Sequence, residues 1–494
     1  MPDRPQAVAE LLADHPPALA DDPDLRASIR ELRAEDGRLL GVLDDDPTGS
    51  QAVHDVQVVT VLDEAAYEDA FAAAAGGTAT CFVLTNSRSL PEQQAAAQTA
   101  DAARGLLAVA GRRGAPIDLI SRSDSTLRGH VIAETAALAG VLREKNGTGP
   151  DGVLFIPAFI EAGRLTIGDV HWARGEAGMV PVGETEFARD RVFGYASSNL
   201  PEFLSAKSGA LSAAAVASIS LTDIRSGGIP RVREVLASAR DGTWIVVNAA
   251  AYSDLETVAK AVLLAERSGQ SFAFRTGPSF VRALSGIDPR APLRGKELAP
   301  SRERSENPNG PHGLIVVGSH VGQSTKQLNA LMTTRELTSV ELQAAGVISA
   351  APDLVPSTAE RVAEALGLTD VVLYTSRDVL HGGDGQDDLA VARAVSAALA
   401  RTVRLALTGK PAWIIAKGGI TSHDVALQGL GIRRAEVAGQ LFPGLISVFR
   451  PADAAPEAIG MPYVVFPGNV GDDQALVRAV TLMDDGAAGM YGGG

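Results

Sequence analysis

Three aspartates stand side by side at residues 44–46, directly after the apolar stretch "LLGVL" and before the turn residues "PTGS". Adjacent carboxylates repel one another, and they lose hydration on burial unless a cation, a hydrogen-bond donor or water takes up their charge. A single aspartate would suffice to cap a helix or a turn, so three exceed that need. We predict that Asp45 and Asp46 hold a divalent cation or act as a base toward a substrate hydroxyl.

A second polar cluster, "SRSDSTLRGH", follows the apolar stretch "IDLI". In this cluster, Arg122 and Arg128 could clamp a carboxylate, and Gly129 would let the backbone approach a ligand. The alternative is a capped helix start with solvated arginines. Two more loops each add an arginine: Arg88 in "TNSRS" and Arg164 in "PAFIEAGRLTIGDVHW". The histidine of the second loop, His171, is either structural or a ligand contact. These clusters suit a small polyhydroxy anion.

Glycine-bearing turns form a third set, in "VVGSHVGQST", "AKGGITSHD" and "FPGNVGDD". Backbone N–H groups at such turns bind phosphate, and Lys417 could neutralise phosphate charge. The sequence has no G-x-x-x-x-G-K-[ST] motif, no G-x-S-x-G motif and no Cys/His cluster with metal-ligand spacing. A nucleotide at these turns and a small anion at the first clusters would suit phosphoryl transfer.

The stretches that precede these clusters are short, continuous and rich in β-branched residues, as in "CFVL", "WIVV" and "LIVV". Such stretches are typical of strands buried on both faces of a parallel sheet, and residues 91–111 and 386–407 carry helical apolar spacing between them. We predict an α/β protein with two three-layer α/β domains, mainly parallel sheets and an interdomain cleft. Ligands bind beyond the carboxyl ends of such strands, where every cluster falls.

The chain has 494 residues, too many for one ordinary core, and its composition indicates where the domains divide. A polar stretch rich in Pro and Asn predicts a linker between a substrate domain and a nucleotide domain. The predicted segments are a helical N-terminal extension (1–37), the substrate-binding domain (38–295), the linker (296–312), the nucleotide-binding domain (313–485) and a flexible tail (486–494).

Charge and hydropathy exclude several classes of partner. The net charge of −15 argues against nucleic acid, and no apolar run approaches the roughly 18 residues of a membrane span. The N-terminus lacks the basic and apolar regions of a signal peptide, and the single cysteine permits no internal disulfide. We therefore expect a cytoplasmic protein.

The order of "DD-x-TG", "DSTLRG", "PAF-x-EAGR", "GG-x-TS" and "GN-x-G" over about residues 41–480 resembles the four-carbon acid-sugar kinase family. Its members phosphorylate threonate, erythronate or 3-oxo-tetronate, so the resemblance implies ATP and Mg²⁺ as cofactors. It implies catalysis by Asp45 and Asp46, with one of them near Mg²⁺. The implied contacts with the sugar acid are Asp124, Ser125, Thr126 and Arg128, and those with ATP are Ser319, Gly418, Gly419, Thr421, Gly468, Asn469 and Gly471. We add Arg88 and Arg164 as substrate contacts, because either could help Arg128 to hold the carboxylate.

The sequence departs from the family pattern at several places, among them Pro47 in place of a leucine and Arg122, Ser123 and His130 around "DSTLRG". Asp44 replaces an alanine, so we expect it to serve the turn or a nearby arginine. Ile420 replaces an acidic residue, and Phe466 and Pro467 replace Lys-Ser beside a nucleotide turn. These departures leave open a non-catalytic sensor that binds an acid sugar and a nucleotide. An isomerase that works without ATP is a third alternative, and a homodimer stays open.

Overall fold

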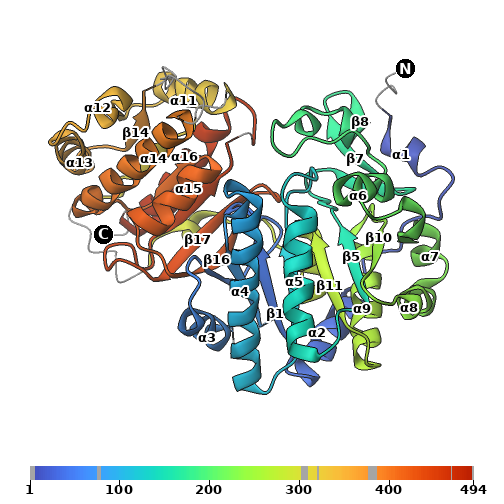
Figure 1. Ribbon diagram of the computed structural model, residues 1–494. Coiled ribbons are helices and arrows are strands. Elements are labelled where there is room, and N and C mark those ends of the chain that lie inside the picture. Colours follow the sequence, from blue (N-terminus) through green and yellow to red (C-terminus); the bar gives the residue numbers. More distant parts are fainter. Residues whose placement is uncertain are drawn as a thin grey trace. The chain divides into compact units, whose positions relative to one another are not determined.

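The computed structural model describes residues 6–74, 79–301, 310–319, 322–376, 387–468 and 470–491. The chain divides after Pro289 into two compact units (Figure 1). Each unit is built from strands that alternate with helices along the chain. The prediction of an α/β protein with two domains is confirmed.

The first unit contains a parallel sheet, in the order β2-β3-β1-β4-β11-β5-β10-β9. Its central strand β1 is buried at every position, as its continuous apolar sequence predicts. The bounds are β1 Leu39–Asp44, β2 Val56–Val59, β3 Thr80–Leu84, β4 Ile117–Arg122, β5 Gly152–Ile156, β9 Ala217–Ile219, β10 Thr243–Val247 and β11 Phe272–Thr276.

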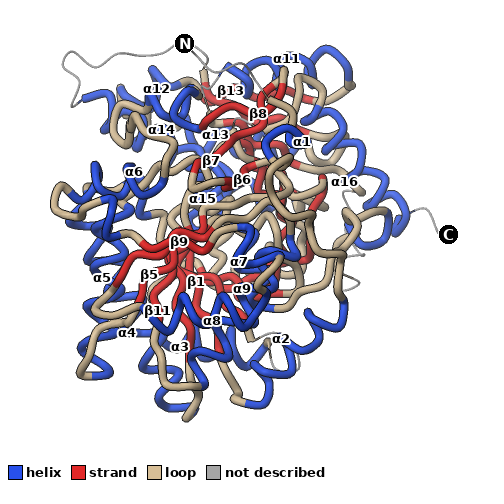
Figure 2. The backbone as a smooth tube through the Cα atoms, turned by 90° about the vertical axis from the view of Figure 1, so that its right-hand side faces the viewer, coloured by secondary structure: helices blue, strands red, loops and turns tan. Residues whose placement is uncertain are grey.

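Helices cover both faces of this sheet (Figures 1 and 2). On one face α3 packs on α4 and α4 on α5, and on the other α9 packs on α2, α8 and α10. The bounds are α2 Pro23–Glu35, α3 Glu64–Ala73, α4 Glu92–Arg113, α5 Val131–Asn146, α6 Leu200–Ser208, α7 Leu221–Arg225, α8 Gly228–Ser238, α9 Tyr252–Arg267 and α10 Pro278–Ser285. A short helix, α1 Val8–Leu11, precedes them.

The first unit also holds a small antiparallel sheet, β6-β7-β8, that the sequence did not predict. Its strands are β6 Arg164–Ile167, β7 Val170–Gly175 and β8 Gly178–Pro181. A single bridge between Thr166 and Ala249 ties it to the loop after β10. This sheet places Arg164 at the start of β6, on the loop side of the main sheet.

The predicted N-terminal extension packs against the first unit. In α2, Ile29 is fully buried, and the guanidinium of Arg33 donates to Asp118 over 2.8 Å. Arg26, on the same helix, pairs with Asp288 over 3.0 Å. The extension is therefore held by buried apolar and charged contacts.

The second unit has a mixed sheet in the order β13-β14-β12-β15-β18-β17-β16, parallel from β13 to β18 and antiparallel beyond. Its strands are β12 Leu314–Val317, β13 Thr338–Leu342, β14 Val371–Thr375, β15 Ile414–Lys417, β16 Arg434–Phe442, β17 Ile446–Asp453 and β18 Tyr463–Phe466. Its helices are α11 Gly322–Thr334, α12 Ala344–Ile348, α13 Leu354–Ala365, α14 Asp387–Ala406, α15 Gly419–Asp424 and α16 Ala475–Tyr491.

The edges of the second unit differ from the predicted segments. Leu293 donates its N–H to Gln440 over 2.8 Å, and Leu298 is fully buried in the core beside Trp413. The chain thus joins the second unit from Arg290 onward, before the predicted linker, because these leucines fill its apolar core. Helix α16 continues to Tyr491 through most of the predicted tail. No helix in the described ranges is long and apolar enough to cross a membrane.

Candidate functional site

Strands β3, β1 and β4 are parallel neighbours, so their carboxyl ends bring three of the predicted polar clusters together. The backbone joins them directly. The N–H of Asp45 donates to the carbonyl of Arg122 over 3.2 Å, and the N–H of Thr85 donates to the carbonyl of Asp44 over 2.9 Å. The triple aspartate, the Arg88 loop and the "DSTLRG" loop therefore form one site.

Asp44 pairs with Arg122, at 2.6 Å between Oδ1 and Nη1. Burial raises the pKa of Asp44 to about 7, with a further contribution from its two acidic neighbours, while Arg122 opposes the shift. A Cβ on Gly49 would lie 2.0 Å from Asp44 Oδ2, so the pair is packed against a position that only glycine fits. The expectation that Asp44 serves an arginine is confirmed. The predicted clamp of Arg122 and Arg128 is wrong, because Arg122 is buried on Asp44.

Asp45 and Asp46 share Arg88. Its Nη2 lies 2.6 Å from Asp45 Oδ1, and its Nη1 lies 3.1 Å from Asp46 Oδ2. Burial raises the pKa of Asp45 despite Arg88. At Asp46 burial also opposes ionisation, but Arg88 and Thr48 hold the pKa below its usual value. The Asp46 side chain is 22% exposed and that of Asp45 is 3% exposed, so Asp46 is the carboxylate that a ligand can reach.

Arg275 and Glu134 lie behind this pair, and the sequence reasoning missed both. Arg275, on β11, is fully buried and donates to Glu134 and to Ser121 Oγ, the latter over 2.6 Å. Glu134, on α5, also accepts from Ser87 Oγ. The arginine inside the apolar stretch "FAFRT" was the signal that could have found this cluster.

The "DSTLRG" loop presents Asp124 and Arg128 together. Arg128 Nε donates to Asp124 Oδ2 over 2.6 Å, and Thr126 Oγ1 donates to the same oxygen. Arg88, Arg128 and Thr126 together hold the pKa of Asp124 well below its usual range, against the effect of burial. Ser125 is buried and takes part through its carbonyl, which accepts from a histidine.

That histidine is His171. Its Nε2 lies 2.8 Å from the Ser125 carbonyl and its Nδ1 lies 2.9 Å from Thr166 Oγ1. The ring is fully buried, and burial lowers its pKa to about 4. These contacts favour the structural alternative over direct contact with a ligand.

The guanidinium groups of Arg128 and Arg164 both pack over the same aromatic ring. Their guanidinium carbons lie 5.1 and 5.7 Å from the centre of Phe187, which belongs to the short helix Glu186–Arg189. Arg164 Nη1 donates to the Ala162 carbonyl over 2.6 Å, and its buried Nε finds no partner among the described residues. Two neighbouring guanidiniums favour a carboxylate or phosphate ligand. Phe187 was not predicted, because no charge marks it.

The second unit gathers small residues at the carboxyl ends of its neighbouring strands β12, β15 and β18. A Cβ on Gly418 would lie 2.8 Å from Ser319 Cβ, and one on Gly468 would lie 3.1 Å from Ser319 Oγ. Gly418 has φ +113°, which favours glycine. Three of the predicted nucleotide residues therefore meet at one point, while Asn469 lies outside the described residues.

The other predicted nucleotide residues lie around this point. Gly419 begins α15, where Thr421 is buried, and the carbonyl of Gly471 accepts from Gln323 Nε2 over 3.0 Å. Lys417 is fully buried, and its Nζ donates to the carbonyls of residues 467 and 468 over 2.7 and 3.2 Å. Burial lowers its pKa to about 7. Lys417 thus holds the turn after β18, and its role toward a phosphate stays a prediction.

The carboxylates of Asp45 and Asp46 accept hydrogen bonds from donors of the protein. Asp46 Oδ1 accepts from the N–H of Thr48 over 2.8 Å, and its other oxygen faces Arg88. Asp45 is likewise held by Arg88 through both oxygens. The described part of the chain contains no group of three or more acidic, His or Cys side chains placed to hold a metal ion. That one of the two aspartates lies near Mg²⁺ stays a prediction.

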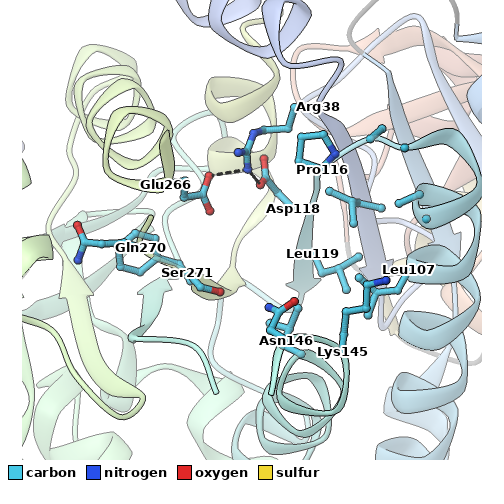
Figure 3. A pocket seen from close by; sticks show the side chains of 17 residues that line it. Arg38, Leu107, Pro116, Asp118, Leu119, Lys145, Asn146, Glu266, Gln270 and Ser271 are labelled. Carbon is cyan, nitrogen blue, oxygen red and sulfur yellow. Dashed lines mark hydrogen bonds and ion pairs between the residues drawn. The ribbon is translucent and has the colours of Figure 1, made fainter. Parts of the chain in front are cut away.

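A pocket of about 480 Å³ opens at the opposite edge of the first unit's sheet (Figure 3). It lies at the amino ends of β4 and β11, where Arg38 Nη1 bridges Asp118 over 2.6 Å and Glu266 over 2.9 Å. Its two acidic side chains are thus paired with Arg38, and ligands of parallel sheets bind at the carboxyl ends. We therefore place the candidate site at the other edge, on the polar loops.

Comparison with known proteins assigns a role to each unit. Residues 40–284 match the sugar-binding N-terminal domain, and residues 314–476 match the nucleotide-binding C-terminal domain. The chain joins a sugar-binding domain to a nucleotide-binding domain. The polar loops after β1, β3 and β4 lie in the sugar-binding domain, and the glycine turns lie in the nucleotide-binding domain. No curated protein matches the sequence.

Solved structures share this fold at low identity. A Haemophilus influenzae protein is 16% identical over 90% of this chain and 100% of its own, with a TM-score of 0.57. A Salmonella typhimurium LT2 protein, provisionally described as a tRNA synthase, is 16% identical over 90% of this chain and 98% of its own, with a TM-score of 0.62. At this identity the likeness shows the fold alone.

Proposed function

We propose that the protein is an ATP-dependent kinase that phosphorylates a hydroxyl of a small, four-carbon-like sugar acid. The observation that carries the proposal is the edge of the sugar-binding domain, where two guanidiniums on one ring lie beside the Asp45–Asp46 pair. The guanidiniums suit a carboxylate and the carboxylates suit hydroxyls. The nucleotide-binding domain on the same chain supplies a place for ATP.

Each residue takes a role that its surroundings permit. Arg128 and Arg164 hold the carboxylate of the sugar acid, and Asp46, the exposed member of its pair, orients the hydroxyl. Arg88 is 18% exposed, so it can reach the phosphoryl group and stabilise its charge during transfer. Catalysis then comes mainly from positioning and charge stabilisation, which is the rule for phosphoryl transfer.

The nucleotide binds through backbone N–H groups at the turns that contain Gly418, Gly419 and Gly468, beside Ser319 and Thr421. The pinned turn after β18 keeps Gly468 and Gly471 in place through Lys417 and Gln327. Mg²⁺ stays a prediction from the family resemblance, and no step here is assigned to it.

The experiment is a panel of four-carbon sugar acids with ATP, read as ADP production. Wild type should turn over at least one acid, and Asp46→Asn and Asp45→Asn should each lower kcat by about 100-fold or more. Asp101→Asn is the matched control, because Asp101 is 69% exposed on the surface of the same domain. It should leave kcat unchanged.

The other outcomes separate the alternatives. ATP binding by calorimetry without ADP production on any acid would favour a sensor. The observation that supports this alternative is the exposed Ile420 beside the nucleotide turn, in place of an acidic residue. Conversion of a sugar acid without ATP would favour an isomerase. Near-normal turnover in both aspartate variants would remove Asp45 and Asp46 from the mechanism.

A further inference from the structure

Arg275 is fully buried and incompletely paired. Its Nη1 donates to Ser121 and Glu134, but its Nε and Nη2 have no hydrogen-bond partner within the described residues. A buried donor without a partner is unfavourable, and such groups are rare in folded proteins. Their presence on a charged side chain beside the candidate site therefore needs a reason.

The unpaired edge of Arg275 faces Asp45. The distance between Arg275 Nη2 and Asp45 Oδ2 is 3.9 Å, too long for a hydrogen bond. Gly129 bounds the space between them: a Cβ there would lie 3.0 Å from Asp45 Oδ2 and 3.1 Å from Arg275 Nη2. Gly129 has φ +115°, so the backbone also favours glycine at this position. An approach of about 1 Å would complete the bond.

The present partner of Asp45 is Arg88, which solvent reaches. Under the proposed function, an anionic substrate or the transferred phosphoryl group competes for the charge of Arg88. Asp45, with a side chain 3% exposed, would then lose its nearest cation. Arg122 Nη1 also lies 3.6 Å from Asp45 Oδ1, but it already donates to Asp44 over 2.6 Å. A buried carboxylate without a partner is strongly unfavourable. If Arg275 approached Asp45, it would pair its own free donor in the present structure. It would also neutralise the Asp45 carboxylate after Arg88 has turned to the ligand.

We propose that Arg275 is a positioning residue that takes over the Asp45 carboxylate when Arg88 turns to the anionic ligand. This inference rests on the proposed kinase function. Ser121 and Glu134 anchor Nη1, so Nη2 and Nε stay available to Asp45 without the loss of those contacts. Glu134 also accepts from Ser87, the residue before Arg88, so one set of contacts joins the two arginines.

The test compares Arg275→Lys and Arg275→Met with wild type on the best sugar acid, measuring kcat and KM. We expect Arg275→Met to lower kcat by about 30-fold or more, with KM for the acid within about threefold, because the substrate contacts are intact. Arg275→Lys keeps the charge but cannot bond Glu134 and Asp45 together, so its kcat should fall by about tenfold.

Arg225→Met is the matched control. Arg225 is as deeply buried in the same domain, but both its Nε and Nη2 bond Asp254 over 2.9 Å. This variant should lose stability like Arg275→Met and keep kcat within about threefold. In an Asp45→Asn background, Arg275→Lys should change the residual kcat by less than twofold, because its effect acts through Asp45.

Three results would overturn the inference. A kcat of Arg275→Lys within twofold of wild type would show that Arg275 only supports the fold. Full additivity of Arg275→Lys with Asp45→Asn would show that it acts elsewhere. A wild type that phosphorylates no sugar acid would remove the proposed function and this inference with it, whereas the first two leave the kinase standing.

Discussion

The two domains build their sites from different materials. In the sugar-binding domain the strand ends carry charged side chains that pair with one another, with Arg88 between Asp45 and Asp46 and Arg128 on Asp124. In the nucleotide-binding domain the corresponding edge carries glycines and a serine, and the one lysine there is turned onto backbone carbonyls.

The buried cations show the same contrast. Asp45 and Asp46 raise the pKa of Arg88 well above its usual value, although burial opposes its charge. Burial lowers the pKa of Lys417 to about 7, and no acidic side chain among the described residues offsets this shift. A site made of side chains can read the hydroxyls and carboxylate of one small molecule, whereas a site made of backbone N–H groups suits phosphate, which all nucleotides share.

The largest effect is expected from a substitution that disturbs the packing of the site in the sugar-binding domain. Gly49→Ala places a Cβ 2.0 Å from Asp44 Oδ2 and 2.4 Å from Arg122 Cζ, so the buried ion pair must separate. We expect a loss of about 3 kcal/mol in the free energy of unfolding, measured by chemical denaturation. Gly140→Ala is the control, because nothing lies within 4 Å of its Cβ on α5. It should gain about 0.5–1 kcal/mol. Equal stability of Gly49→Ala and wild type would contradict the close packing.

The strands, the helices and the edge of the sheet that carries the candidate site could be predicted from the sequence. Buried strands leave continuous apolar stretches, and the polar residues that follow them stand out. The sequence also placed Asp45, Asp46, Arg88 and Arg128 at one edge. It could not predict that Arg122 would be buried on Asp44, because strand order decides which loops meet. Phe187 and Arg275 were missed for opposite reasons. The ring carries no charge in a stretch without periodicity, and the arginine lies inside a buried strand.

The second-largest effect is expected from a substitution at the glycine turns of the nucleotide-binding domain. Gly418→Ala must adopt φ +113° and place a Cβ 2.8 Å from Ser319 Cβ, so the turn has to move. We expect the Kd for ATP to rise about 30-fold by calorimetry, while the affinity for a sugar acid is unchanged. Gly439→Ala is the control, because Gly439 also has a φ that alanine rarely adopts, +148°, and lies on β16, away from the predicted nucleotide residues. An equal rise in Kd for both variants would show that strain alone, and not the site, causes the loss.

A smaller effect sharpens the role of the ring under the two guanidiniums. Phe187→Leu keeps an apolar surface but removes the aromatic face below Arg128 and Arg164. We expect KM for the sugar acid to rise about fivefold, with kcat within about twofold, because each contact is worth about 0.5–1 kcal/mol. The lactone of the same acid, which lacks the carboxylate, should show no change. A similar rise in KM for the lactone would contradict the carboxylate role.

The smallest effect concerns pH. The folded-state pKa of His171, about 4, lies below its unfolded value near 6.5, so the unfolded state binds more protons between these values. Stability from the neutral ring is therefore full above pH 6.5 and falls as pH drops toward 4. From pH 7.5 to 5.5 we expect His171 to account for a loss of about 1 kcal/mol in the free energy of unfolding. His171→Gln should remove this contribution of about 1 kcal/mol. If the variant and wild type show the same pH dependence of the free energy of unfolding, His171 is not its source.

The N-terminal extension has a consequence for where the sugar-binding domain can be cut. Asp118, with a side chain 1% exposed, receives one of its two cations from Arg33 and the other from Arg38. A chain shortened to begin at residue 38 would keep its sheet and its polar loops, yet leave half of that buried charge unanswered and Gly286 without its partner Arg30. The family match begins at residue 40, but the contacts that hold the domain together begin earlier, at α2.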